Sequence, residues 1–225
     1  MNDAAVPEER RQALEALQDW LVQQILDGQG FVPTALESLE QRSRRERARL
    51  TGLFEQALQS FVRGLEVLAS LEERETAEIA ARWLQHRGDV DALAQAVEHD
   101  ADRAFPLFVD AAISLSRADD LHRAADSVGV LTMVFPLEPQ PYSILGTIIW
   151  KLEGLDAAVS YYDTLLQAIE HPMIHYFAAD CFASAGDPDR ALRLLKEALV
   201  LCDENPEAAA EFRARIESFQ AELDA

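Results

Sequence analysis

Several residue types are scarce in this sequence of 225 residues, and each scarcity excludes a class of structure or partner. Lysine occurs only as Lys151 and Lys196, and 40 acidic residues against 20 basic ones give a formal net charge of −20. A surface with this charge repels phosphate groups, so nucleic acids and anionic membranes are unsuitable partners. Glycine and proline each occur only 9 times, and no run of alternating β-branched residues is present, which favours helices over sheets.

Cysteine and long apolar runs are also rare. Cys181 and Cys202 are the only cysteines, which is typical of a protein with reduced thiols. The longest apolar stretches, such as Ile144 to Trp150, are far shorter than the roughly 20 residues of a membrane-spanning helix. The first residues lack the basic start and apolar core of a secretory signal. The expected location is therefore the cytoplasm.

Residues 1–100 are predicted to form an N-terminal helical region. Apolar residues at helical spacing predict a helix over Glu8–Leu26, which the glycines and proline of DGQGFVP end. The run over 74–100 has the pattern of a degenerate helical hairpin with Gly88 in its turn. The helices of this region are the candidate surface for a homodimer, and a helical bundle that binds a partner by itself is an alternative interpretation.

Arginines concentrate between Arg42 and Arg49. The pattern fits the solvated face of a long helix better than a patch for an acidic partner, because the chain as a whole is strongly acidic. Pairing of this cluster with the acidic C-terminal half of the same chain is a further alternative.

The sequence from residue 105 to residue 206 repeats three times, with separations of 34 and then 33 residues. Small residues recur at Ala112, Gly146 and Ala179, and again at Ala124, Ala158 and Ala191. This period and pattern are those of the tetratricopeptide repeat, in which two antiparallel helices form a unit and the units stack. The sequence therefore predicts an all-α tetratricopeptide-repeat helical solenoid with an N-terminal helical extension and a C-terminal capping helix over 207–225.

A histidine pair in the last unit raises the question of a metal or catalytic site. His171 and His175 are four residues apart, with Cys181 further along. Pro172 disfavours helical geometry at His171, and Cys181 falls where a small apolar residue fits. Asp187 and Asp189 flank a turn and resemble turn and capping residues. The sequence therefore predicts no catalytic residue, no metal ligand and no cofactor, and a protein that is not an enzyme.

The last two units also carry a set of residues found together in one family. These are Tyr142, Leu145, Gly146, Ser160 and Tyr161, followed by Pro172, His175, Ala178, Ala179, Cys181, Gly186, Asp187 and Ala191. In this respect residues 105–206 resemble the class II chaperones of bacterial type III secretion systems (the SycD/LcrH type). The resemblance implies an acidic, cytoplasmic, all-helical bacterial protein that keeps a hydrophobic translocator subunit soluble and competent for secretion. A generic tetratricopeptide adaptor without a role in secretion is the alternative.

In this kind of repeat the first helix of each unit lines the concave face. By position, the residues expected there are Val109, Ile113, Ser143, Thr147, Trp150, Lys151, Tyr176 and Asp180. The mixture of apolar and polar groups suits an extended peptide of a protein partner. Trp150 and Tyr176 are the strongest candidates for anchors, because aromatic residues dominate binding hot spots.

Overall fold

The structure is a computed structural model that describes residues 39–204 and 206–223, and within these ranges it contains helices and short connections but no strand. The fold of the described chain is therefore all-α, as the sequence predicts. The predicted helix over Glu8–Leu26 lies outside the described residues. The chain divides into two compact parts, residues 1–62 and residues 63–225, and the three repeats belong to the second part.

The arginine-rich segment lies in α2 (Leu39–Ala69), a single long helix. Arg44, Arg45 and Arg49 are exposed, as expected for the solvated face of a helix. The last residues of α2, from Arg63 onward, belong to the second part of the chain, where Leu65 and Leu68 are fully buried.

Gly64 marks a close approach of α2 to α5 (Leu121–Val134). A Cβ atom at this glycine would lie 2.1 Å from the carbonyl oxygen of Asp126 and 2.5 Å from Cγ2 of Val130. Beside it, the guanidinium of Arg63 pairs with the Asp126 carboxylate at 3.3 Å. Only a residue without a side chain allows the two backbones to come this close.

Helix α3 (Arg74–Gln85) is followed by α4 (Val90–Arg117), which runs without interruption through Pro106. The sequence pattern divides this stretch between a hairpin over 74–100 and a first repeat that begins near residue 105. In the structure these two segments are continuous, because α4 is both the second helix of the first hairpin and the first helix of the first repeat. Asp89 caps α4 by accepting hydrogen bonds from the backbone of Asp91 and Ala92, both at 3.2 Å.

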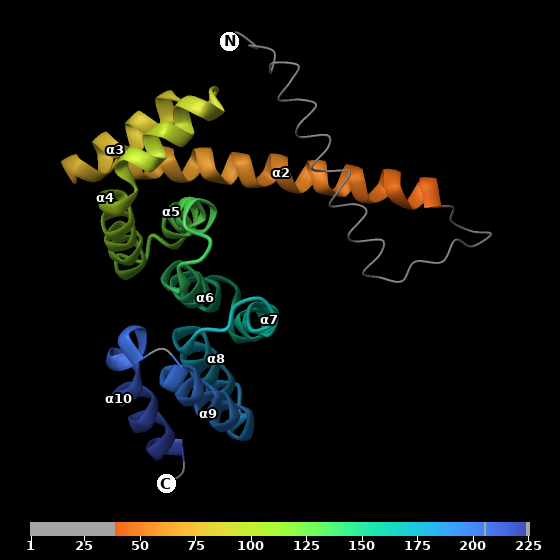
Figure 1. The fold of residues 1–225 in the computed structure, drawn as a ribbon, viewed down its shortest axis with the longest axis vertical. Helices are drawn as coiled ribbons and strands as arrows, with labels where there is room; N and C mark the ends of the chain where they lie inside the picture. The colour runs from red at the N-terminus through yellow and green to blue at the C-terminus, as the bar shows by residue number, and fades with distance from the viewer. Residues whose placement is uncertain (1–38, 205, 224–225) are drawn as a thin grey trace. The chain divides into compact units, whose positions relative to one another are not determined.

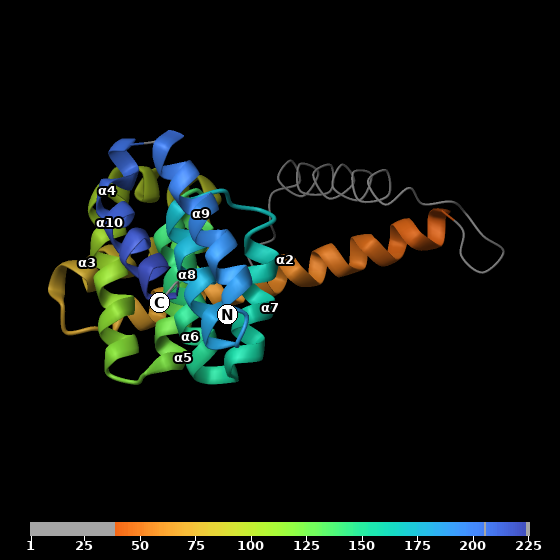
Figure 2. The same cartoon turned by 90° about the horizontal axis from the view of Figure 1, so that it is seen from below.

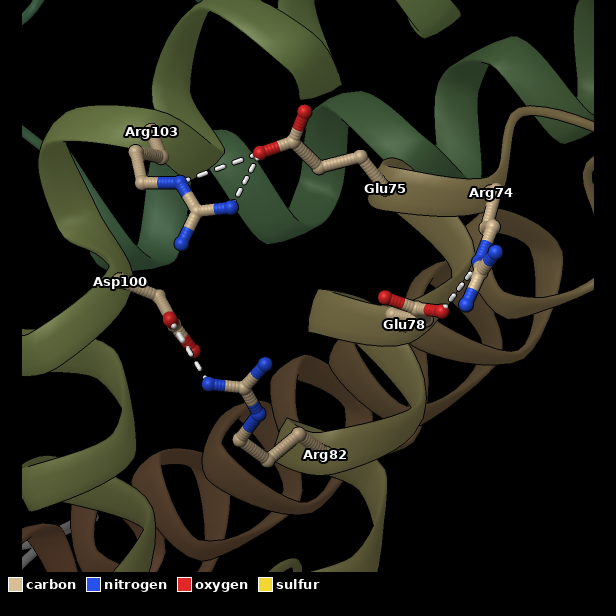
Figure 3. Close-up of polar contacts among 6 residues, drawn as sticks. All are labelled: Arg74, Glu75, Glu78, Arg82, Asp100 and Arg103. Atoms are coloured by element: carbon tan, nitrogen blue, oxygen red, sulfur yellow. Dashed lines mark hydrogen bonds and ion pairs between the residues drawn. The ribbon is translucent and has the colours of Figure 1, made fainter.

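A buried carboxylate fastens α3 to α4 (Figure 3). Asp100 is only 1% exposed, and one of its oxygens accepts a hydrogen bond from Nη1 of Arg82 at 3.0 Å. Its other oxygen accepts from Nε1 of Trp83 at 3.2 Å. Arg103 on α4 and Glu75 on α3 form a second ion pair between the same helices. A buried charge needs such partners, because its desolvation is otherwise costly.

The remaining helices form two further hairpins and a last helix, which follow one another from green to blue in Figure 1. They are α6 (Pro139–Glu153), α7 (Leu155–Leu165), α8 (Pro172–Ser184), α9 (Pro188–Glu204) and α10 (Pro206–Leu223). Helix α4 pairs with α5, α6 with α7, and α8 with α9, and α10 packs on α9 and α8 (Figures 1 and 2). Among the described helices, none has the combination of length and apolarity that a membrane span requires.

The repeated small residues lie at the contacts between helices. All of them are buried, namely Ala112, Gly146, Ala179, Ala124, Ala158 and Ala191. A Cβ atom at Gly146 would lie 2.2 Å from the hydroxyl oxygen of Tyr162, whose ring fills the space between α6 and α7. At this contact the missing side chain of Gly146 and the large ring of Tyr162 are therefore complementary in shape.

The turns of the first and last units share one geometry with different residues. Asp119 has φ 63°, and Gly186, at the equivalent position of the last unit, has φ 82°. The following amides donate to equivalent carbonyls, from Asp120 to Leu115 at 3.0 Å and from Asp187 to Phe182 at 2.9 Å. The first turn therefore places an aspartate in a left-handed conformation that glycine adopts more easily.

Candidate functional site

The residues predicted for the inner face are distributed over the first helices of the three units. Val109 and Ile113 lie on α4, Ser143, Thr147, Trp150 and Lys151 on α6, and Tyr176 and Asp180 on α8. Val109 and Ser143 are buried, whereas Ile113, Trp150 and Tyr176 are half-buried and Thr147, Lys151 and Asp180 are exposed. The two buried residues are therefore poorly placed to contact a partner directly.

Two of the predicted residues make contacts between neighbouring units. The amine of Lys151 donates to the carbonyl oxygen of Ser116 at 3.1 Å, at the end of α4 where helix carbonyls lack partners within the helix. The hydroxyl of Ser143 donates to the carbonyl of Gln140 at 2.8 Å and lies 3.6 Å from the sulfur of Met173. These contacts tie α6 to the units before and after it.

Tyr176 and Asp180, two more of the predicted residues, line a groove between α8 and α10. The groove is open to solvent and has a volume of about 520 Å³. Phe177 completes its α8 wall, and its α10 wall is formed by Ala214, Arg215, Ser218, Phe219 and Glu222. The sequence interpretation missed the α10 wall because it treated the tail only as a polar cap. A signal was present in the helical spacing of Phe212, Ile216 and Phe219.

Aromatic rings form the apolar surface around Tyr176. Its ring lies edge-on to those of Phe177, Phe212 and Phe219, with centroid distances of 5.4, 6.1 and 5.9 Å. The guanidinium carbon of Arg215 lies 5.7 Å from the Tyr176 centroid, within the range of a cation–π contact. Tyr176 thus joins α8 to α10 and still presents part of its surface to the groove.

The Asp180 carboxylate stands beside this aromatic surface. Asp180 is exposed, but neighbouring atoms remove part of its hydration, and this desolvation raises its pKa. The groove thus combines an apolar platform with a polar rim of both charge signs, an arrangement that can hold a peptide side chain and orient it by charge.

The histidines and cysteines of the same hairpin have structural contacts. His171 lies just before α8 in an extended conformation, as Pro172 predicts, and its Nδ1 accepts a hydrogen bond from the amide of Met173 at 3.1 Å. Nδ1 of His175 contacts the His171 carbonyl oxygen at 3.1 Å. Within the described ranges, no group of three or more histidine, cysteine or acidic side chains is arranged to hold a metal ion.

The Cys181 thiol lies in the interior of the last hairpin. It is fully buried, and desolvation raises its pKa to about 11. A nucleophilic cysteine needs the opposite, a lowered pKa and access for a substrate.

Asp187 accepts a hydrogen bond from the amide of Arg190 at 3.0 Å, which is the geometry of a helix cap.

Stacked helical hairpins and an open groove define an all-helical scaffold with a candidate protein-binding surface. Two solved structures of the type III secretion translocator chaperone SycD from Yersinia enterocolitica are similar to this chain. One, described as an alternative dimer, is 19% identical with a TM-score of 0.43, and the match covers 53% of this chain and 91% of that one. The other is 18% identical with a TM-score of 0.42, and the match covers 55% of this chain and 85% of that one.

SycD is a chaperone of the kind that the sequence motifs of residues 105–206 resemble. At these values the likeness concerns the fold alone, so a function has to be argued from the groove and its residues. A scan against protein-family models and a search of curated proteins found no match.

Proposed function

We propose that this chain is a cytoplasmic chaperone that binds an extended segment of a client protein along the inner face of its repeats and in the α8–α10 groove. The client is a type III secretion substrate of the translocator type, which the chaperone keeps soluble. The observation that carries the proposal is the groove, where Tyr176 offers an aromatic surface beside the Asp180 carboxylate in a hollow open to solvent. Extended peptides bind in such places through side-chain pockets with polar groups at the rim.

The sequence supports the same proposal independently of the groove. Residues 105–206 carry the repeat period and the motif residues of the class II secretion chaperones, and proteins of that class bind hydrophobic clients. Half-buried Trp150 and Tyr176 provide anchors of the kind that dominate peptide recognition. A tetratricopeptide adaptor would use the same surface, so the identity of the client separates the two functions.

The first experiment is capture of partners with the tagged full-length chain in its native bacterial host, followed by mass spectrometry. A chaperone of the proposed type should retain one dominant partner with long apolar segments. Recovery of water-soluble partners without such segments would support the adaptor and contradict the secretion role.

The second experiment measures the affinity of the captured client for variants of the anchors. Because truncation of a central aromatic residue removes a hot spot, Trp150→Ala and Tyr176→Ala should each weaken binding by about tenfold or more. Tyr176 also packs against α10, so a loss of stability must be separated from a loss of contact. The control is Val128→Ala, which creates a cavity at a fully buried position of α5. It should lower the unfolding temperature and leave client affinity unchanged; equal affinity of all variants would refute the assigned surface.

A further inference from the structure

The one arginine of the α8–α10 groove contacts aromatic rings, whereas its two carboxylates lack an ion-pair partner among the described residues. Arg215 on α10 stacks over the rings of Tyr176 and Phe212, at 5.7 and 5.6 Å from their centroids. Asp180 on α8 and Glu222 on α10 line the same groove. Among the described residues, neither carboxylate has a basic nitrogen within the 4.0 Å of an ion pair. Within the described ranges the groove therefore holds two carboxylates and one guanidinium with no ion pair among them.

Asp180 is the more informative of the two carboxylates. Loss of hydration raises its pKa, and no neighbouring positive charge acts in the opposite direction. A cation close to a carboxylate would lower the pKa of that group. The Asp180 carboxylate is therefore partly desolvated without compensation, and a positive group that entered the groove would find an acceptor there.

Resting on the proposed function, we propose that the α8–α10 groove receives a lysine or arginine side chain of the client segment, with its charge against Asp180 and its stem on the aromatic surface. Tyr176, Phe177 and Phe219 provide the rings. Long basic side chains bury their methylene groups on apolar surface while the charged head stays at a polar rim. The net charge of −20 favours the approach of a basic segment.

A second hollow in the last hairpin serves as a comparison. It has a volume of about 330 Å³ and is lined by Glu170, Glu197 and Glu204 together with His175, Val200 and Leu201. This hollow is acidic but has no tyrosine, phenylalanine or tryptophan in its lining. Neutralising one carboxylate of this second hollow changes the net charge of the protein by the same amount as neutralising Asp180. It leaves the lining of the α8–α10 groove unaltered, so it serves as a charge-matched control.

The test begins with random peptides displayed on phage and selected on the intact full-length chain. Selected peptides are synthesised, and their dissociation constants are measured for the original chain, for Asp180→Asn and for Glu204→Gln. The selected peptides should share a basic residue next to apolar ones. Asp180→Asn should weaken their binding about fivefold, the upper end for a partly exposed ion pair, and Glu204→Gln should change it little. Replacement of the basic residue by norleucine should weaken binding and also remove the difference between Asp180→Asn and the original chain.

The outcomes separate this proposal from the function on which it rests. Selected peptides that lack a basic residue, or that bind Asp180→Asn as tightly as the original chain, overturn the basic-side-chain proposal. An equal loss with Glu204→Gln overturns it too, because the effect would then be a general attraction to an acidic protein. In each of these cases a loss of binding with Tyr176→Ala leaves the proposed function standing. A failure to select any peptide that Tyr176→Ala weakens overturns both.

Discussion

Two glycines of the same helix provide the most direct test of how α2 packs. Gly52 and Gly64 both lie in α2, but their surroundings differ. A Cβ atom at Gly52 would meet no atom within 4 Å, whereas at Gly64 it would lie 2.1 Å from the Asp126 carbonyl oxygen. The same substitution by alanine should therefore have effects of opposite sign at the two positions.

The magnitudes follow from helix propensity and packing. Alanine is better than glycine in a helix interior by about 1 kcal/mol, so Gly52→Ala should stabilise the protein by up to that amount. At Gly64 the new methyl group meets a backbone oxygen that cannot rotate away, and α2 and α5 must separate. Such overpacking costs about 3 kcal/mol at the upper end of its usual range. After the gain in propensity is subtracted, Gly64→Ala should destabilise the protein by about 2 kcal/mol.

The assay is urea unfolding followed by far-ultraviolet circular dichroism, with the slope of the transition compared between variants to check that the unfolded states are equivalent. A double variant with Val130→Ala sharpens the result. It removes the side-chain contact at 2.5 Å but leaves the carbonyl contact at 2.1 Å, so it should not restore stability. If Gly64→Ala stabilises the protein as much as Gly52→Ala does, the close approach of α2 to α5 does not exist in solution and the reasoning is refuted.

Three further predictions concern the polar contacts, the thiols and one turn. Asp100→Ala should lower the free energy of unfolding by about 1–3 kcal/mol, because it leaves the buried Trp83 N–H without its acceptor. Asp102→Ala, at an exposed position of the same helix, should have little effect in the same urea-unfolding assay, and equal effects of the two variants would contradict the network. Cys181 and Cys202 are buried with raised pKa values, so both should resist a thiol reagent in the native protein and react after unfolding. A cysteine placed at exposed Ser184 should react at once, and fast reaction of the two natural thiols in the native protein would disprove their burial. Asp119→Gly should stabilise the protein by about 0.5–1 kcal/mol, because φ 63° suits glycine better, and Asp119→Ala should not stabilise it. If urea unfolding shows that Asp119→Gly is less stable than the original chain, the aspartate side chain itself stabilises the turn.

The hairpins could be predicted from sequence because their determinants are local and repeated. The contact of Gly146 with Tyr162 joins two helices of one unit, and the same small positions recur in the other units. Pro172 likewise fixes the start of α8 through the residue directly before it. Periodicity also assigns a residue to a face of its helix, which is why spacing alone could propose Tyr176 and Asp180 for the inner face.

The contacts between distant segments were not visible in the same pattern. Lys151 fits the inner face by spacing, but the sequence does not show that its amine reaches the carbonyl of Ser116 in the preceding unit. The α10 wall of the groove is a second example. Phe212, Ile216 and Phe219 have helical spacing, but only the packing of α10 on α8 shows that the two phenylalanine rings contact Tyr176. In both cases the contact depends on tertiary packing, which local spacing does not specify.

The position of α10 couples the stability of the scaffold to the candidate binding site. The last hairpin would expose an apolar face without a covering helix, and α10 covers it with the buried Phe212 and Ile216. The same helix presents Arg215 and Glu222 to the groove. Any variant that loosens α10 therefore affects unfolding and binding together, and a lost affinity after truncation of an aromatic residue does not by itself locate the site. A charge substitution such as Asp180→Asn leaves the apolar packing of α10 intact, so it isolates recognition from folding.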